Sequence, residues 1–339
     1  MRSLVCAVAL AATIVGAGFG AAPGRAQPAT PATAAADAAT AYPLTVENCG
    51  RTLTFDGPPE RVITGYQPVL EPLLALGLDD RIVGRTRFEE NGPDGFLPGQ
   101  KDAYDRIPEI SEEILFPSKE VMFSLAPDLV VSEGYYTFEP GSGNATIEEL
   151  EAAGANVYIT GRWCSAEDQL AYTIDDTYDD ILNLGRIFDI QPQAEAIVAD
   201  MRSQVADAQE RIAGLPKPRV LVFCCGEGPY GVYGGAGLMN ELVEMAGGEN
   251  VLAYVEDDYF QINVEEIAAS NPDVYVVIDY LPIPGSEKVA FLESVTLDSP
   301  AARDDRFVLL PAVASHPGYR NPLAVVDLAK AFHPEAFAE

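Results

Sequence analysis

The residues of this chain best suited to hold a ligand are aromatic and basic side chains in expected loops. They are Tyr66, Arg87, Tyr135, Tyr136, Arg162, Trp163, Tyr230, Tyr233, Tyr259, Tyr280, His316 and Arg320. Aromatic rings stack on flat ligands, and arginine pairs with anionic oxygens. The chain has only 21 basic residues against 52 acidic ones, so four loop arginines, counting Arg85, indicate an anionic ligand. The alternative role of each arginine is a surface ion pair, and the alternative role of each tyrosine is packing against other side chains.

Residues for enzyme chemistry are scarce. The only histidines are His316 and His333, too few for a multi-histidine metal site, and there is no Cys-x-x-Cys pair and no Gly-x-Ser-x-Gly elbow. We therefore expect a binding protein with no cofactor and no resident metal rather than an enzyme. An exported hydrolase with two catalytic carboxylates stays open as an alternative, although no acidic pair stands out. A structural or adhesive protein would show low complexity along the whole chain, whereas only the leader does.

The elements that must position these residues alternate between short strands and helices. A hairpin is expected over residues 44–55, and apolar runs predict strands over 61–64, 81–84, 128–131, 157–159, 219–223, 274–278 and 307–310. This rhythm is typical of parallel sheets with helices on both faces. Ligands bind beyond the carboxyl ends of such strands, and the candidate residues follow these runs.

One segment, residues 165–188, predicts a long amphipathic helix between two α/β units. Its apolar residues recur every three or four positions, and Ser165 is suited to cap its start. The predicted fold is α/β, with two Rossmann-like lobes of mainly parallel sheet joined by one long rigid helix and a ligand cleft between the lobes. The predicted boundaries are 42–164 for the N-terminal lobe, 165–190 for the connecting helix and 191–339 for the C-terminal lobe.

The first residues carry an export signal rather than part of the fold. Arg2, an apolar run and small residues up to Ala26 predict a signal peptide over 1–26, followed by a flexible Ala/Pro/Thr leader over 27–41. We expect a soluble, monomeric, extracytoplasmic protein after cleavage. With a formal net charge of −31, nucleic acid is excluded as a partner.

Four cysteines remain after the signal. In an exported protein they are expected to be bridged. We pair Cys49 with Cys164, because each borders the first lobe; Cys224 and Cys225 are then left as a bridge between neighbouring residues or as two free thiols.

A short phrase occurs once in each half of the chain. Glu120 stands seven residues before Pro127-Asp128, and Glu265 stands seven residues before Pro272-Asp273, each followed by a strand-forming run. This predicts a short helix, a turn and a buried strand, built twice. Either glutamate has a structural alternative at the positive end of its helix.

These segments together resemble the substrate-binding proteins of ABC importers for iron complexes and vitamin B12, the subgroup with a single rigid helix between its lobes. The resemblance runs from about Tyr42 to the end and rests on NCG (48–50), PPERVIT (58–64), LLALGLDDRIVG (73–84), SLAPDLVV (124–131), GGENV (247–251) and HPEAF (333–337). It implies a ligand held between the lobes and delivered to a membrane permease. It also implies that Glu120 and Glu265 dock onto arginines of the two permease subunits.

The expected ligand is a pre-chelated metal complex, which needs no metal-ligand cluster in the chain. A ferric siderophore comes first, because arginines would neutralise an anionic ligand shell. Haem or cobalamin is the alternative, with Tyr135, Tyr136 or His316 as axial contacts.

Overall fold

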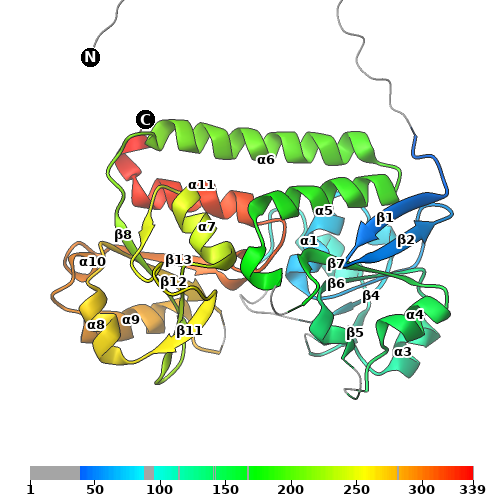
Figure 1. Cartoon of the computed structure of the whole chain (residues 1–339), viewed down its shortest axis with the longest axis horizontal. Coiled ribbons are helices and arrows are strands. Elements are labelled where there is room, and N and C mark those ends of the chain that lie inside the picture. The colour runs from blue at the N-terminus through cyan, green and yellow to red at the C-terminus, as the bar shows by residue number, and fades with distance from the viewer. Residues whose placement is uncertain are drawn as a thin grey trace, which may run out of the picture. The chain divides into compact units, whose positions relative to one another are not determined.

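The structure is a computed structural model of the chain. It describes residues 39–87, 95–113, 115–139, 141, 143–165, 168–280 and 282–338, except for the side chains of Arg162 and Gln169. The predicted signal peptide and most of the predicted leader lie outside these residues. Residues 39–339 belong to one compact unit, which holds two lobes with a sheet each (Figure 1).

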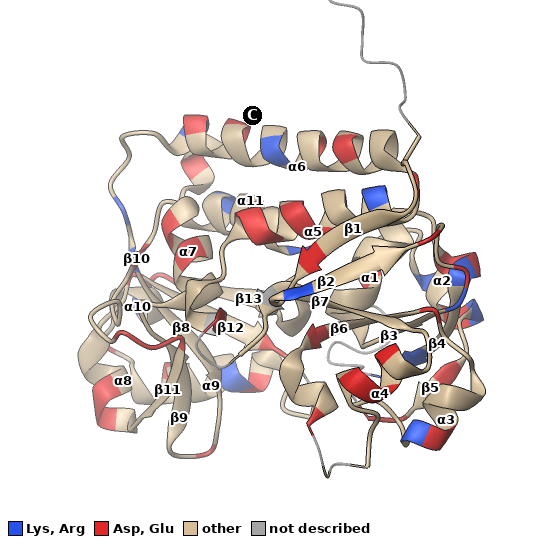
Figure 2. Ribbon diagram, turned by 45° about the vertical axis from the view of Figure 1, so that its right-hand side comes forward, with Lys and Arg blue, Asp and Glu red and all other residues tan. Residues whose placement is uncertain are grey.

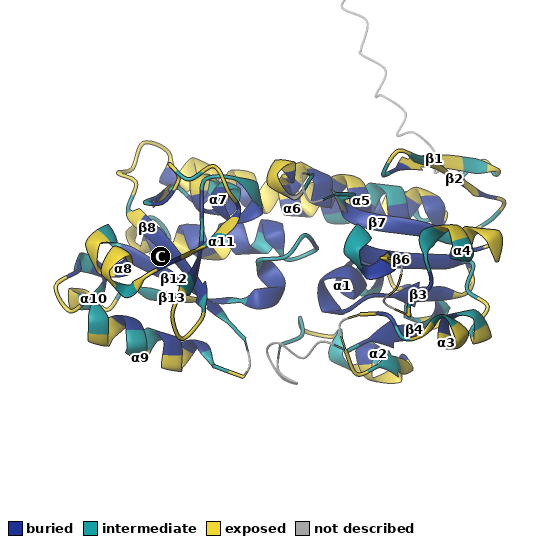
Figure 3. Ribbon diagram, turned by 60° about the horizontal axis from the view of Figure 1, so that its bottom comes forward, coloured by how far each residue is buried: buried dark blue, intermediate teal, exposed yellow. Residues whose placement is uncertain are grey.

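The N-terminal lobe is built on five parallel strands in the order β5-β4-β3-β6-β7. They are β3 (Val62–Thr64), β4 (Ile82–Thr86), β5 (Glu109–Ser111), β6 (Leu129–Gly134) and β7 (Asn156–Trp163), and their helices are α1 (Gln67–Ala75), α2 (Lys101–Arg106), α3 (Lys119–Ser124) and α4 (Ile147–Ala152). Every residue of β3 and β6 is buried, as expected for strands covered on both faces (Figure 3). The chain order reverses between β3 and β6, so the crevice at their carboxyl ends is the expected ligand position.

A hairpin of β1 (Leu44–Asn48) and β2 (Arg51–Phe55) covers one edge of this lobe. A disulfide joins Cys49, in its turn, to Cys164, directly after β7. Beside it the Asn48 side-chain amide forms two 2.8 Å hydrogen bonds with the backbone of Ile159. The hairpin is therefore fixed to β7 both covalently and by hydrogen bonds.

The C-terminal sheet is mixed rather than parallel throughout. Its order is β11-β9-β8-β12-β13, with β10 also paired to β8. The parallel strands are β8 (Arg219–Cys225), β10 (Glu249–Asn250), β12 (Val274–Asp279) and β13 (Phe307–Pro311), whereas β9 (Tyr230–Tyr233) and β11 (Tyr259–Ile262) are antiparallel. The helices of this lobe are α7 (Gly237–Met245), α8 (Val264–Ser270), α9 (Gly285–Val295), α10 (Pro300–Arg303) and α11 (Asn321–Phe332).

The helix expected over residues 165–188 is shorter than predicted. A 3-10 turn at Asp168–Ala171 precedes α5 (Ile174–Ile187), which Thr173 and Asp176 start with a capping box. Ser165 does bond to Asp168, but this pair belongs to the 3-10 turn. The helical periodicity is genuine only from Ile174, since Leu170 is 42% exposed.

The helix that extends over both lobes is α6 (Gln191–Ile212), of 22 residues. The chain reverses at Asp189, so α6 returns above α5 and then packs on α11 of the C-terminal lobe (Figure 1). One hydrophobic cluster runs from the hairpin and α1 through α5 and α6 to α11 and β8. The two lobes therefore share a core.

Candidate ligand-binding site

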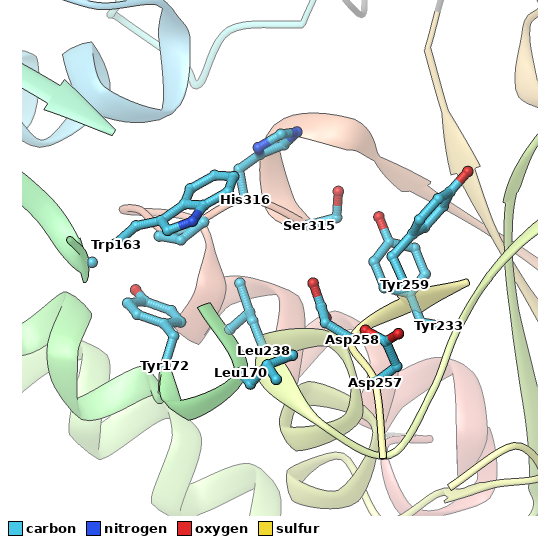
Figure 4. Close-up of a pocket in the computed structure, with 12 residues that line it drawn as sticks. Trp163, Leu170, Tyr172, Tyr233, Leu238, Asp257, Asp258, Tyr259, Ser315 and His316 are labelled. Carbon is cyan, nitrogen blue, oxygen red and sulfur yellow. The ribbon is translucent and has the colours of Figure 1, made fainter. Parts of the chain in front are cut away.

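A pocket of about 420 Å³ lies where the end of β7 faces the loops of the C-terminal lobe (Figure 4). Its lining residues are Gly161, Trp163, Leu170, Tyr172, Tyr233, Leu238, Asp257, Asp258, Tyr259, Ser315, His316 and Pro317. Both lobes thus contribute to it. Of the predicted ligand contacts, it brings together Trp163, Tyr233, Tyr259 and His316.

Aromatic rings form opposite walls of the pocket. Trp163 ends β7, and its ring lies 5.1 Å from that of Tyr136 between ring centroids. Across the pocket, Tyr233 and Tyr259 meet edge to face at 5.8 Å, because β9 and β11 pair in register at these two residues. Such walls suit a ligand with a flat face.

The charged side chains in the described lining of the pocket are two aspartates. Asp257 is exposed at its wall, while Asp258 is buried. A Cβ on Gly237 would come within 2.6 Å of the Asp258 Oδ1 atom, so this carboxylate lies against the start of α7, where the helix dipole favours it. Among the described lining residues there is no lysine and no arginine.

A buried glutamate joins the lobes beside the pocket. Glu133, at the end of β6, accepts hydrogen bonds from the Tyr66 and Tyr136 hydroxyls and lies 2.7 Å from His316 Nδ1. Burial raises the pKa of Glu133, but the charge of His316 and these three hydrogen bonds outweigh burial, and the net pKa is lowered. Glu133 is therefore ionised, and Tyr66, Tyr136 and His316 are its hydrogen-bonding partners.

Arg320 is held in a second contact between the lobes. Its Nε atom lies 2.8 Å from Oε2 of Glu71 in α1, and Gln67 donates to the same carboxylate. The side chains of Arg320 and Glu71 are 11% and 0% exposed. This arginine neutralises a buried glutamate and is not part of the pocket lining.

Arg85 and Arg87, whose side chains are described, also lie away from the pocket. Arg87 and Arg85 both pair with Glu109 at 3.2 Å, and Arg85 stacks on Tyr104. The backbone of Arg162 lies in β7, but its side chain is outside the described residues.

Three predicted tyrosines have other surroundings. Tyr135 packs against the second hydrophobic cluster of the first lobe. Tyr230 stacks on Phe291 with 4.7 Å between centroids. Tyr280 lies beside Cys224 and under the ammonium of Lys288. None of the three is in the described lining of the pocket.

Sequence reasoning missed Glu71, Glu133, Asp257 and Asp258. Glu71 and Glu133 were detectable, since each is a single acidic residue within or directly after an apolar run, which indicates a buried partner. The two aspartates stand in an acidic loop, where no pattern separates them from solvent-exposed neighbours.

A second candidate site consists of the two glutamates of the repeated phrase. Glu120 and Glu265 are both exposed, and each is the second residue of its short helix, α3 or α8 (Figure 2). Hydrogen bonds from its own backbone N–H and from Ser118 lower the pKa of Glu120. The adjacent Glu266 bonds to the N-cap residue Asn263.

The repeat extends to two arginines beyond the phrase. Asp128 accepts from the backbone N–H of Arg61 at 2.9 Å, and Arg61 Nε donates to the Leu125 carbonyl. In the other lobe Asp273 accepts from the backbone N–H of Arg219 at 2.8 Å, and the Arg219 guanidinium donates to the carbonyls of Asn271 and Ser270. The two lobes therefore build the same turn, which places Glu120 and Glu265 equivalently.

The described part of the chain has neither a membrane-spanning helix nor a cluster of metal ligands. No helix there is long and apolar enough to cross a membrane. No group of three or more His, Cys, Asp or Glu side chains there is arranged to hold a metal ion.

Comparison with known proteins agrees with this architecture. A solved protein from Saccharomonospora viridis, described as an ABC-type Fe3+-hydroxamate transport system, is 30% identical, with a TM-score of 0.70 over 88% of this chain and 100% of that one. A periplasmic binding protein from Veillonella parvula gives a TM-score of 0.73 at 24% identity, over 86% of this chain and 97% of the other.

A cobalamin-binding protein of Halobacterium salinarum is 27% identical over 245 residues, which is 71% of this chain and 60% of that protein. The alignment thus spans less than two thirds of that relative. The family model of periplasmic binding proteins matches residues 62–316, which include the sheets of both lobes and every described lining residue of the pocket except Pro317. The chain belongs to the periplasmic binding protein family.

Proposed function

We propose that this protein is the extracytoplasmic substrate-binding component of an ABC importer and that its ligand is a corrinoid such as cobalamin. The observation that carries the ligand class is a pocket with aromatic walls, two aspartates and no described arginine or lysine. A corrin ring is flat, and its amide side chains donate hydrogen bonds that carboxylates accept. The pocket would hold one part of such a ligand, and the remainder would extend beyond it.

The proposal of a corrinoid ligand differs from the expectation, drawn from the sequence, that the ligand is a ferric siderophore. An anionic catecholate complex would face Asp257 and Asp258 with its own negative charge. Of the arginines expected to neutralise it, Arg87 and Arg320 are paired with glutamates, and the side chain of Arg162 lies outside the described residues. A neutral ferric hydroxamate complex remains the second candidate, which the Saccharomonospora viridis relative favours by its description.

A titration separates these ligands. Trp163 is the only tryptophan of the chain, so its fluorescence reports on the pocket. We expect cyanocobalamin to quench it with a Kd of about 1 μM or below, and a ferric hydroxamate, a ferric catecholate or haem to bind at least about tenfold more weakly.

Calorimetry on variants then tests whether the ligand binds in this pocket. Tyr259→Ala should weaken cyanocobalamin about 10- to 100-fold through lost stacking. Tyr254→Ala is the matched control, because Tyr254 is 79% exposed in the segment just before β11 and is outside the described pocket lining. Tight binding of a ferric complex with no binding of cyanocobalamin would reject the corrinoid assignment.

We also propose that Glu120 and Glu265 dock the protein onto two permease subunits. Two equivalent carboxylates, one from each lobe, suit a partner with two like halves, because each half makes the same charged contact. Their equivalence rests on the duplicated Arg61–Asp128 and Arg219–Asp273 turns.

The test is a double variant, Glu120→Ala with Glu265→Ala. We expect ligand affinity and melting to stay nearly constant while binding to the cognate permease falls more than additively. The control with the same charge change is Glu195→Ala with Glu210→Ala, on the exposed face of α6. Equal transport by both double variants would leave Glu120 and Glu265 with only their role at the helix starts.

A further inference from the structure

A pair of neighbouring cysteines lies at the carboxyl end of β8, where the proposed function does not use it. Cys224 and Cys225 end this strand, and Tyr280 follows the adjacent strand β12. This is the C-terminal counterpart of the edge that carries Tyr66 and Glu133 in the first lobe. It is a sheet edge at which α/β proteins place reactive and ligand-binding groups.

A β-bulge lies at this pair of cysteines. In the ladder between β8 and β9, Phe223 lies opposite Val232 and Cys225 opposite Gly231, so Cys224 is an extra residue on β8. Neighbouring side chains of a regular strand point to opposite faces, whereas a bulge redirects one of them. The bulge therefore interrupts this alternation at Cys224, directly beside Cys225.

The groups around the pair make one thiol more reactive than the other. Cys225 Sγ lies 3.4 Å from the Tyr259 hydroxyl, and Cys224 Sγ lies 3.9 Å from the Tyr280 hydroxyl. Lys288 Nζ is buried 3.6 Å from the centroid of the Tyr280 ring. The hydrogen bond from Cys224 and those from Tyr259 and Tyr280 lower the pKa of Cys225, while the same thiol pair and burial raise the pKa of Cys224.

The reactive thiol is also accessible. Cys225 is partly exposed, whereas Cys224 is buried. Tyr259, the neighbour of Cys225, lines the pocket. Its hydroxyl crosses β9 at Gly231, because a Cβ on Gly231 would lie 2.1 Å from the hydroxyl oxygen. A small reagent that enters the pocket margin therefore meets Cys225 first.

We propose that Cys224 and Cys225 form a redox-active dithiol that reacts with small-molecule disulfides, with Cys225 as the attacking thiol. The Cys225 thiolate attacks one sulfur of the disulfide, and the other sulfur leaves as a thiolate that takes up a proton. Cys224 then loses its proton and attacks Cys225 in the mixed disulfide, which releases the second small thiol. The net change oxidises the dithiol to a Cys224–Cys225 disulfide and reduces one small disulfide to two thiols.

This disulfide would be readily reversible. Neighbouring Cα atoms are about 3.8 Å apart, closer than the roughly 4.4 to 6.8 Å that disulfides prefer. Strained disulfides are the labile ones, whereas Cys49–Cys164 spans 115 residues and serves as a structural link.

The experiment treats the purified protein, with Cys49–Cys164 intact, with oxidised glutathione at about pH 6 and follows its mass under non-reducing conditions. We expect the wild type to lose two hydrogen atoms without retaining glutathione. Cys224→Ser should stop with one glutathione on Cys225, and Cys225→Ser should stay unchanged. The rate for the wild type should exceed that of free cysteine roughly tenfold at this pH.

Two further variants protect the test against misfolding. Cys224→Ala should trap the same adduct as Cys224→Ser, and Tyr259→Phe should react more slowly than wild type at about pH 6 but equally at about pH 9. Peptide mapping of the Cys49–Cys164 disulfide verifies that each variant is folded. The proposal is overturned if the wild type keeps both thiols, or if it accumulates a glutathione adduct that never closes.

Discussion

At the residue scale, a buried aspartate makes stability depend on pH. Asp180 of α5 accepts a 2.6 Å hydrogen bond from the Tyr158 hydroxyl and another from the backbone of Gly161. Burial nevertheless raises its pKa to about 7, from the 3.8 that is usual for an aspartate. The folded state thus retains a proton that the unfolded state releases between about pH 4 and pH 7. Stability from this group is fully present below pH 4 and is lost as the pH rises through 7.

The variant Asp180→Asn should remove this dependence. Relative to wild type, its free energy of unfolding should be about 2 to 3 kcal/mol higher at pH 8 than at pH 5. Urea unfolding at the two pH values measures the difference, and Asp179→Asn, at an exposed neighbour, is the control with the same charge change. An identical pH response of the two variants would mean that Asp180 is ionised throughout.

At the element scale, the turn between α5 and α6 depends on a glycine. A Cβ on Gly185 would lie 2.4 Å from the Cβ of Ala194, well inside van der Waals contact. Gly185→Ala should therefore cost about 1 to 3 kcal/mol by overpacking, although alanine alone would favour the helix by about 1 kcal/mol.

A double-mutant cycle checks this account. Ala194→Gly should recover part of the loss in the Gly185→Ala background, while alone it should destabilise. Gly57→Ala is the control, because nothing lies within 4 Å of the added Cβ. Strict additivity in thermal unfolding would contradict the steric explanation.

The strands that could be predicted from sequence are those with continuous apolar runs. Each of β3, β6, β8 and β12 falls where such a run predicts a strand, because a strand covered on both faces needs one. The antiparallel strands β9 and β11 have short mixed sequences, YGVY and YFQI, which carry no such signal. The apolar spacing predicts a start of α5 that is too early, since the 3-10 turn before the helix continues this spacing.

The candidate site was predictable in part for a related reason. Loops after strands could be found, which gave Trp163, Tyr233, Tyr259 and His316. Which loop arginines face the pocket depends on partners that are distant in sequence, such as Glu71 for Arg320, 249 residues apart. No local pattern encodes that distance.

At the scale of the whole described unit, the lobes are fixed to each other before any ligand arrives. A continuous core and the pairs Glu71–Arg320 and Glu133–His316 join them. We expect solution scattering to show almost no change when cyanocobalamin binds, because closure would break the buried Glu71–Arg320 pair and the partly buried Glu133–His316 pair.

Arg320→Ala tests this directly. It leaves Glu71 buried without its partner, so we expect it to lower the free energy of unfolding by about 3 to 5 kcal/mol and to speed hydrogen exchange in α1 and α11. Arg87→Ala is the control, since its partly exposed pair with Glu109 should contribute at most about 1 kcal/mol. A closure of tens of degrees in the wild type would show that the two pairs do not restrain the lobes.

If Glu120 and Glu265 dock onto a permease as proposed, the same fixed lobes limit how the permease distinguishes empty from loaded protein. An empty and a loaded molecule would present Glu120 and Glu265 at nearly the same separation. Docking alone would therefore scarcely distinguish the loaded protein from the empty one. Discrimination must then come from the ligand surface left uncovered at the pocket margin, or from the rate at which the docked protein releases it. Empty protein would accordingly compete with loaded protein for the transporter, and import would slow when the binding protein greatly outnumbers its ligand.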